Sequence, residues 1–322
     1  MESTNKPYVI GLDLGGTNSV FGIVDSRGEI KASTAIKTQA YEDANDYVAA
    51  ACEALQPIID VVGGIDKIKG MGIGAPNGNY YTGNIEFAPN LRWKGIVPLA
   101  KLFSEKLGVP AALTNDANAA AIGEMTYGVA RGMKNFTMIT LGTGVGSGIV
   151  INGQLVYGSD GFAGELGHMT VDYSAEARPC ACGKKGCLEA YCSATGVART
   201  AKEILTSTSE PSLLRELDID NITSLDVAIA AEKGDKVAKS IFEFTGTLLG
   251  KACAYIALFS SPEAFVFFGG LTKAGALIMD PIKQAYDDNI LKVFKGKAKL
   301  LVSSLEGSEA AVLGASALAW EL

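Results

Sequence analysis

Apolar and polar positions in the first part of the chain alternate between the short runs of strands and the longer spacing of helices. Residues 8–36 form short apolar runs separated by the turn sequences GGTN and SRGE, which predicts a β-meander. The pattern then predicts alternating helices and strands at about 41–62, 68–76, 97–107, 111–115 and 116–128. Strands that alternate with helices indicate an α/β layer.

The second half of the chain restarts this pattern. The segment 138–156 reads as strand, Gly-Thr turn, strand, short turn and strand, as the segment 11–30 does. This weak internal repeat predicts two similar domains facing each other, although two glycine-rich turns can also resemble each other by chance. After residue 190 the chain is largely helical, and the apolar stretch 245–270 predicts a buried helix followed by a buried strand. A final strand and helix close the pattern.

Composition and charge narrow the classes of ligand. The 322 residues are 48% hydrophobic, enough for one large or two ordinary domains. The net charge of -7 argues against nucleic acid as a partner, so an anionic ligand must meet backbone amides or a bound cation. Charged residues and a proline interrupt 245–270, so we expect no membrane span. The first residues lack the features of an export signal, and we expect a cytoplasmic protein.

Glycine-rich turns are candidates for phosphate binding. DLGGTN at 13–18 follows a strand directly, and GTGVGSG at 142–148 repeats its chemistry. Successive backbone N–H groups and a threonine hydroxyl can converge there on phosphate oxygens, and Asp13 could hold Mg²⁺ or its waters. FGGLTKAG, near 268, could complete a nucleotide site. The turns match neither the P-loop nor the dinucleotide pattern, so ordinary hairpins and strand-to-helix connectors remain the alternative.

Carboxylates and amides gather around these turns in the sequence. Asn115 and Asp116 stand at a predicted strand-to-helix junction, where side chains project at the carboxyl edge of an α/β sheet. The same position suits a helix N-cap, which is the alternative. Glu165, Glu189 and Asn90 are further polar candidates. Carboxylates and amides can grip the hydroxyls of a sugar, and one carboxylate can remove the proton of the attacking hydroxyl.

The only histidine, His168, precedes a tight group of cysteines at Cys180, Cys182 and Cys187. This set matches a Cys₃His zinc site, and four protein ligands leave no open position for a substrate, so the zinc should be structural. Three buried free cysteines are the alternative. A zinc ion here would fix the glutamates on either side of the cluster around one pocket and leave the second ring nitrogen of His168 for a ligand hydroxyl.

With these motifs in order, the chain resembles the ROK family (repressor, open reading frame, kinase) of the sugar kinase, Hsp70 and actin superfamily. The motifs are DLGGTN, APNL, TNDANAAA, LGTGVGSG, GELGH and CACGKKGCLE, and the resemblance covers nearly the whole chain. It implies two ribonuclease-H-like α/β domains around a cleft, with a structural zinc knuckle in the second. The implied domains are a small one at 1–122, a larger one at 123–303 and a C-terminal helix at 304–322 that packs back on the small domain.

The resemblance further implies ATP-dependent phosphorylation of an aldohexose at its 6-hydroxyl, as in a glucokinase, with Asp116 as the general base. The implied hexose contacts are Gly74, Asn90, Asn115, Asp116, Glu165, His168 and Glu189. The implied ATP contacts are Gly11, Asp13, Gly15, Gly16, Thr17, Asn18, Gly142, Thr143, Gly144, Gly146, Gly269 and Gly270. The implied metals are Zn²⁺ on His168, Cys180, Cys182 and Cys187, and Mg²⁺ that accompanies ATP, near Asp13. A homodimer or homotetramer is also implied.

Other functions remain open. A kinase for N-acetylglucosamine, N-acetylmannosamine or fructose would use the same contacts. A sugar-responsive transcriptional regulator needs a helix-turn-helix, which we do not expect because about seven residues precede the first strand. A zinc-stabilised sugar-binding module without turnover is a further alternative. The sequence departs from the family at the Asn77–Asn84 loop, where Tyr80 and Tyr81 stand, and this loop either affects substrate preference or is an exposed turn without consequence.

Overall fold

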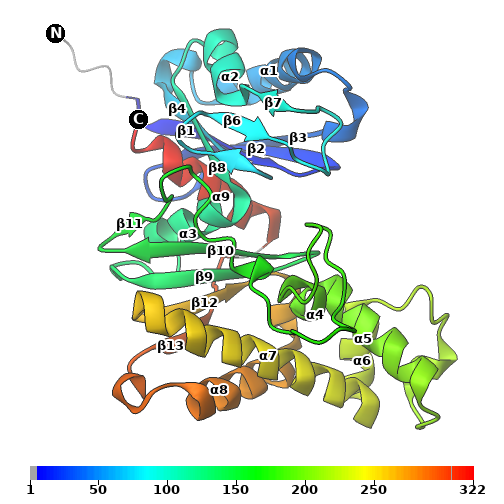
Figure 1. Ribbon diagram of the computed structural model, residues 1–322. Helices are drawn as coiled ribbons and strands as arrows, with labels where there is room; N and C mark the ends of the chain where they lie inside the picture. The colour runs from blue at the N-terminus through cyan, green and yellow to red at the C-terminus, as the bar shows by residue number, and fades with distance from the viewer. Residues whose placement is uncertain (1–5, 306) are drawn as a thin grey trace. The chain divides into compact units, whose positions relative to one another are not determined.

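The computed structural model describes residues 6–305 and 307–322 (Figure 1). The α/β class expected from the sequence is confirmed, and the chain divides into two compact units. The first unit comprises Met1–Met133, Gly148–Ala163 and Ser303–Leu322, and the second comprises Lys134–Ser147 and Gly164–Val302. The domain bounds expected from the sequence stay a prediction.

The elements of the first unit are β1 (Tyr8–Leu14), β2 (Asn18–Asp25), β3 (Ile30–Lys37), α1 (Ala44–Val61), β4 (Ile68–Ala75), β5 (Gly78–Asn79), β6 (Asn84–Glu86), β7 (Ile96–Val97), α2 (Leu99–Leu107), β8 (Ala111–Asn115), α3 (Asp116–Tyr127), β11 (Gln154–Leu155) and α9 (Gly307–Ala319). Those of the second unit are β9 (Phe136–Leu141), α4 (Glu189–Cys192), α5 (Ala194–Ser207), α6 (Ser224–Glu232), α7 (Lys236–Ser260), β12 (Ala264–Phe268), α8 (Ala276–Asn289) and β13 (Lys299–Val302). The strand β10 (Val145–Ile151) contains the boundary. Short 3₁₀ helices are η1 (Thr38–Ala40), η2 (Ile65–Lys67), η3 (Leu166–His168), η4 (Leu213–Glu216), η5 (Gly270–Ala274) and η6 (Lys292–Phe294).

The predicted order of strands and helices is confirmed. The meander is β1 to β3, the helix-then-strand stretch is α7 and β12, and the final strand and helix are β13 and α9. The structure adds a small sheet of order β5-β6-β7. The sequence pattern missed it because strands of two or three residues are too short for their alternation to be read.

The sheet of the first unit has the order β3-β2-β1-β4-β8, in which β1, β4 and β8 run parallel. Gly11 pairs with Gly22 on β2 and with Gly72 on β4, so three glycines form a row across the sheet. A side chain on Gly11 would overlap the carbonyl oxygen of Val312, which belongs to α9. The row of glycines therefore lets α9 lie directly on the sheet.

The opposite face of this sheet carries α1 and α2 (Figure 1). Ile10 and Leu12 alternate with Gly11 along β1 and are fully buried against residues of these helices, including Tyr47 and Phe103. Because successive strand residues face opposite sides, β1 is covered on both faces. Polar side chains of the sheet can reach solvent at the carboxyl ends of the parallel strands β1, β4 and β8.

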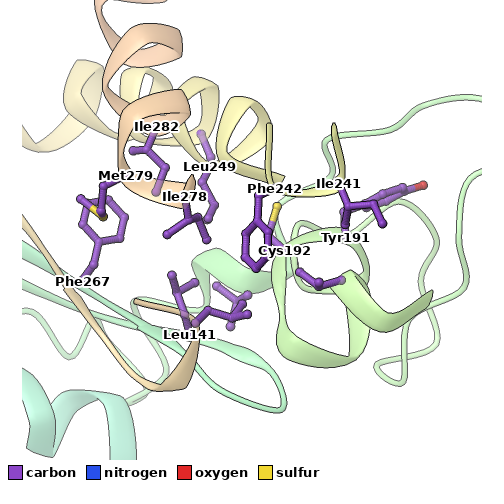
Figure 2. Packing of buried hydrophobic residues seen from close by; sticks show 14 of the residues in the cluster. Leu141, Tyr191, Cys192, Ile241, Phe242, Leu249, Phe267, Ile278, Met279 and Ile282 are labelled. Atoms are coloured by element: carbon purple, nitrogen blue, oxygen red, sulfur yellow. The ribbon is translucent and has the colours of Figure 1, made fainter. Parts of the chain in front are cut away.

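The second sheet has the order β11-β10-β9-β12-β13, with β12 parallel to β9 and to β13. Figure 2 shows the core on one face of it, formed by residues of β9, β12, α4, α7 and α8, namely Leu141, Phe267, Tyr191, Cys192, Ile241, Phe242, Leu249, Ile278, Met279 and Ile282. Among the described residues, α7 is the helix long and apolar enough to cross a membrane, and 61% of its apolar window is buried inside the protein. This burial is typical of a core helix.

Candidate functional site

Four of the predicted site residues meet at one edge of the first sheet. Asp13 pairs with Gly74, and the strand that carries Gly74 pairs with the one that ends at Asn115. Asp116 follows directly as the first residue of α3. The parallel order β1-β4-β8 therefore brings together residues that are far apart in sequence, at the carboxyl ends of the strands, where α/β proteins bind ligands.

The two aspartates at this edge have perturbed acidities. Burial, and then the negative charge of Asp116, raise the pKa of Asp13 from 3.8 to about 6. Crowding by surrounding protein groups also raises the pKa of Asp116, although the residue as a whole is exposed and its carboxylate accepts a hydrogen bond of 2.8 Å from the Ala117 N–H. An accessible carboxylate with a raised pKa is a better proton acceptor than an ordinary one.

Asn115 is the N-cap of α3. Its Oδ1 accepts hydrogen bonds from the N–H groups of Ala117, at 2.8 Å, and Asn118, at 3.4 Å. The N-cap role considered for this position is thus confirmed for the oxygen of Asn115. Its amide nitrogen is a donor that the cap does not use, so capping and ligand binding are compatible for this side chain.

The first glycine turn joins β1 to β2, and its geometry is that of a hairpin. The Gly15 N–H donates to the carbonyl of Asn18 at 3.0 Å. The N–H groups of Gly16 and Thr17 have no partner within residues 6–305 and 307–322. Asn90 lies against this turn, because a Cβ on Gly16 would stand 2.9 Å from the Asn90 carbonyl oxygen. Two backbone donors and an exposed amide side chain therefore meet at this turn.

Gly11 and Asn18 lie on either side of this turn. Gly11 is buried in mid-strand under α9, so its missing side chain serves helix packing. Asn18 is exposed and is the first residue of β2. Among the predicted nucleotide contacts from Gly11 to Asn18, the backbone N–H groups that lack a hydrogen-bond partner in the described chain are thus those at the centre of the turn.

The second glycine turn joins β9 to β10. The Gly142 N–H donates to the Gly144 carbonyl at 3.0 Å, and the Gly146 N–H donates to the hydroxyl of Thr140 at 3.1 Å. The backbone N–H groups of Thr143 and Gly144 carry no hydrogen bond in the described chain. Each glycine turn therefore presents two adjacent N–H donors, the arrangement that binds phosphate oxygens in backbone nests.

The third predicted group lies beside the second turn. Phe268, at the end of β12, pairs with Thr140 near the end of β9. Gly269 then turns with φ +112°, and a side chain on it would overlap the carbonyl of Leu141. Gly270 begins η5 and is exposed. The predicted nucleotide residues of the second unit thus share one edge of its sheet.

The predicted metal ligands converge. The Sγ atoms of Cys182 and Cys187 are 3.6 Å apart, and Nδ1 of His168 is 3.7 Å from Sγ of Cys180. All four ligand atoms lie within 4.8 Å of one another. A tetrahedral zinc ion separates its ligand atoms by about 3.5–3.8 Å, given its usual bond lengths. The cluster therefore fits a metal ion after small movements of its side chains.

The acidities of the three thiols are consistent with a cation site. Burial raises the pKa of Cys180 to about 12 and also raises that of Cys187. Burial opposes ionisation of Cys182 too, but the Lys184 N–H and the two neighbouring thiols lower its pKa. Ionisation is thus favoured for one of the three thiols and disfavoured for the other two. A bound cation would be needed to ionise all three together.

The ring of His168 links this cluster to a predicted sugar contact. Nδ1 faces the cysteines, and Nε2 lies 3.8 Å from a carboxylate oxygen of Glu165. The second ring nitrogen thus lies beside Glu165, and its availability to a ligand hydroxyl stays a prediction. The carboxylate of Glu189 also approaches the cluster, with Oε1 3.7 Å from Sγ of Cys180.

Arg178 anchors the segment that carries Cys180, the first cysteine of the cluster. The sequence pattern did not predict this role of Arg178. Its guanidinium is buried, lies 4.5 Å from the ring centre of Tyr191 and donates to Glu203 at 2.5 Å and to the Ala190 carbonyl at 3.1 Å. A buried, fully paired arginine thus joins the start of the knuckle to α4 and α5. Its place two residues before Cys180 is visible in the sequence, but it does not indicate that the guanidinium is buried.

The Asn77–Asn84 loop is anchored rather than free. Tyr80 stacks on Tyr157 with ring centres 4.1 Å apart and an angle of 7° between the rings, and the hydroxyl of Tyr81 donates to the Gly158 carbonyl at 2.8 Å. A side chain on Gly78 would overlap the backbone of β8 just before Asn115. The loop thus lies beside the junction of β8 and α3, which carries the predicted hexose contacts Asn115 and Asp116.

Comparisons with known proteins agree across the whole chain. The model of the ROK family matches residues 9–321. A glucokinase of Halalkalibacterium halodurans is 38% identical over 313 residues, which cover 95% of this chain and 93% of that protein. A glucokinase of Streptomyces coelicolor is 33% identical over 97% of each chain. The crystal structure of a ROK family glucokinase from Streptomyces griseus in complex with glucose and AMPPNP has a TM-score of 0.81 at 33% identity, and covers 98% of this chain and 100% of that one.

Proposed function

The chain belongs to the ROK family, and from that premise we propose that it is an ATP-dependent hexokinase of glucokinase type. The reaction is transfer of the γ-phosphoryl group of ATP to the 6-hydroxyl of an aldohexose. The observation that carries the proposal is the pair Asp13 and Asp116 at one sheet edge, beside a turn with two free backbone donors. Phosphoryl transfer depends mainly on positioning and on neutralising charge, and these groups suit both tasks.

Asp116 is the proposed general base. Its solvent-accessible carboxylate can accept the proton of the 6-hydroxyl as the oxygen attacks the γ-phosphorus, and its raised pKa favours that transfer. Asp13 would hold Mg²⁺ or its waters, and this cation supplies charge that offsets the phosphates. A cation bound to Asp13 would also offset the electrostatic cost of a buried negative charge. The raised pKa of Asp13 reflects this cost.

Each unit carries proposed hexose contacts. In the first unit these are the side chain of Asn90 and the amide nitrogen of Asn115. Gly74, a further proposed contact, offers only its backbone, and its missing side chain serves packing, because a Cβ there would stand 3.1 Å from Cβ of Ala119 in α3. In the second unit the proposed contacts are Glu165, His168 and Glu189. Amide and carboxylate groups that each grip hydroxyls give the orientation on which transfer to one oxygen depends.

Each glycine turn is a proposed phosphate-binding element of its own unit. The N–H groups of Gly16 and Thr17 in the first turn, and of Thr143 and Gly144 in the second, carry no hydrogen bond within residues 6–305 and 307–322. Backbone donors can bind phosphate locally in a chain whose net charge of -7 offers no general attraction for anions. Gly269 and Gly270 stand next to the second turn and complete the proposed nucleotide contacts.

The proposed metal on His168 and the three cysteines is Zn²⁺, in a structural role. Four protein ligands fill a tetrahedral shell, so the ion would order the knuckle rather than contact the hexose. The ribonuclease-H-like character of the domains, a cytoplasmic location and a homodimer or homotetramer are also part of the proposal.

A coupled ADP-release assay with Mg·ATP tests the proposal. The sugars are glucose, mannose, fructose, N-acetylglucosamine and N-acetylmannosamine, each over a range of concentrations. We expect the highest kcat/KM with glucose. Preference for an N-acetyl sugar or for fructose would replace the substrate and retain the kinase mechanism. No ADP release with any of the sugars would overturn the proposed function.

A further inference from the structure

Glu189 makes a contact that hexose binding does not explain. One carboxylate oxygen, Oε2, accepts the backbone N–H of Val145 at 3.0 Å, directly after the second glycine turn. The same oxygen occupies the place of a side chain on Gly144, and a Cβ there would overlap it. The carboxylate therefore lies flat against the turn, and only glycine at position 144 permits this approach.

The segment that follows Glu189 supports the turn through two further hydrogen bonds. The Ala194 N–H donates to the Gly142 carbonyl at 2.8 Å, and the hydroxyl of Thr195 donates to the Thr143 carbonyl at 3.0 Å. Residues 189–195 thus fix the carbonyls of the turn and the N–H that ends it. The two N–H groups left over, on Thr143 and Gly144, are the proposed phosphate donors.

Both sides of this contact rest on one packed core. Leu141, directly before the turn, and Tyr191 and Cys192, directly after Glu189, belong to the same buried cluster (Figure 2). The other carboxylate oxygen of Glu189 faces the thiol of Cys180 at 3.7 Å. The Glu189 side chain therefore starts from a packed backbone, and its two carboxylate oxygens contact the Val145 N–H and the Cys180 thiol. These contacts restrict its rotamers, as a positioning group requires.

We propose that Glu189 is a positioning residue for the nucleotide: it fixes the Gly142–Val145 turn so that the N–H groups of Thr143 and Gly144 point at the phosphates. This role is additional to any contact with the hexose, and it rests on the proposed function. Oriented backbone donors act without reorganising when charge develops, and loss of their orientation weakens them. Glu189 thereby joins the cysteine knuckle to the nucleotide turn through one carboxylate.

The first test measures the Kd of the Mg·AMPPNP complex by calorimetry, without sugar. Glu189→Ala removes the acceptor for the Val145 N–H and should weaken binding by about 10-fold, as loss of a supporting group does. Glu189→Gln keeps an acceptor oxygen of the same shape and should restore most of the affinity. Glu176→Ala is the control, because Glu176 is an exposed glutamate between His168 and Cys180 and is no proposed contact of the hexose, the nucleotide or the metal. We expect its Kd for the nucleotide to be unchanged.

A double-mutant cycle tests the contact itself. A methyl group in Gly144→Ala would displace the Glu189 carboxylate, so this variant should also weaken Mg·AMPPNP binding. In the Glu189→Ala background the same methyl group would have no other atom closer than 3.9 Å and should cost much less. Interacting residues are expected to be non-additive in this way, whereas independent roles give additive effects.

The outcomes separate this inference from the proposed function. A wild-type protein that fails to bind Mg·AMPPNP would contradict the kinase proposal. A wild-type protein that binds it, with equal Kd for Glu189→Ala and Glu176→Ala, would overturn the positioning role. If Glu189→Ala does not fold, as judged by its thermal unfolding, Gly144→Ala decides: weaker nucleotide binding supports the role, and unchanged binding overturns it.

Discussion

Asp116 lies near enough to Asp13 for its negative charge to raise the pKa of Asp13, and burial and this charge together bring that pKa to about 6. The sequence separates the two residues widely, and the order β1-β4-β8 brings them together. Like charges that share a site are costly unless a cation or a proton intervenes. The pair therefore has consequences for both stability and catalysis.

The raised pKa of Asp13 predicts a specific dependence of stability on pH. The folded protein binds the proton of Asp13 up to about pH 6, whereas the unfolded chain releases it near the ordinary value of 3.8. Protonation of the folded state is thus favoured between these values, so the contribution of Asp13 to stability falls as the pH rises from about 4 to 6. Asp13→Asn should raise the melting temperature at pH 7.5 by about 2–4 °C, taking roughly 1 kcal/mol after allowing for partial exposure.

Calorimetry at two pH values checks this. The gain of Asp13→Asn over the wild type should shrink at pH 4.5, where the folded wild type is mostly protonated at Asp13. MgCl₂ should stabilise the wild type at pH 7.5 more than it stabilises Asp13→Asn. A variant less stable than the wild type at both pH values would mean that Asp13 is not a destabilising charge.

Replacement of the proposed base should affect turnover and leave nucleotide binding intact. Asp116→Asn keeps the size of the side chain and removes its ability to accept a proton, so kcat should fall by about 10²–10⁴-fold. The Kd of Mg·AMPPNP should stay close to that of the wild type. Steady-state kinetics with glucose provide the first value and calorimetry the second. A kcat within threefold of the wild type would exclude Asp116 as the base.

Asn115 offers a way to separate capping from ligand binding. Asn115→Ala removes the N-cap oxygen of α3 and should cost about 1 kcal/mol of unfolding free energy. Asn115→Ser retains a capping oxygen and should keep most of that stability, but it lacks the amide nitrogen. If this nitrogen contacts the hexose, both variants should raise KM for the sugar. Denaturant unfolding and steady-state kinetics distinguish the two effects, and an unchanged KM in both would remove Asn115 from the hexose site.

Metal removal should destabilise the knuckle. Chelation, or Cys182→Ser, should lower the melting temperature and the affinity for hexose together, because metal binding is coupled to folding. Metal content by mass spectrometry should show one zinc per chain in the wild type and less in the variant. Cys52→Ser is the control, since Cys52 lies on α1 apart from the cluster. Unchanged stability with lost activity would indicate a catalytic metal instead.

The stacked pair Tyr80 and Tyr157 should hold the Asn77–Asn84 loop in place. A double-mutant cycle with leucine at each position should give a coupling of about 0.5–1.5 kcal/mol in unfolding free energy, the usual range for aromatic pairs. If the loop also sets substrate preference, the single variants should change the ratio of kcat/KM for glucose and mannose. A coupling near zero would mean that the stack does not anchor the loop.

The sequence predicted local features well and long-range contacts poorly. The helix that begins at Asp116 was predicted because its apolar spacing, its N-cap and the strand that precedes it are neighbours in sequence. The cysteine cluster was predicted because three of its ligands are close together in the chain. The stack of Tyr80 on Tyr157, and the hydrogen bond from Val145 to Glu189, join distant segments, and no pattern of spacing records them.

The small sheet β5-β6-β7 and the packing role of Gly11 show the same limit. A glycine in a strand can contact a phosphate, or it can allow a helix to lie close to the sheet. The position of α9 shows that Gly11 packs against this helix. Arg178 was missed because a buried arginine cannot be distinguished from an exposed one by its neighbours in sequence.

The central claim is that this chain phosphorylates an aldohexose at its 6-hydroxyl with ATP, and identification of the product tests it most directly. Glucose and Mg·ATP would be incubated with the wild type and with Asp116→Asn, and the products followed by ³¹P NMR. We predict glucose 6-phosphate and ADP in equal amounts from the wild type, and a rate lower by orders of magnitude for the variant. ADP with inorganic phosphate and no sugar phosphate, or phosphate on another hydroxyl, would contradict the account.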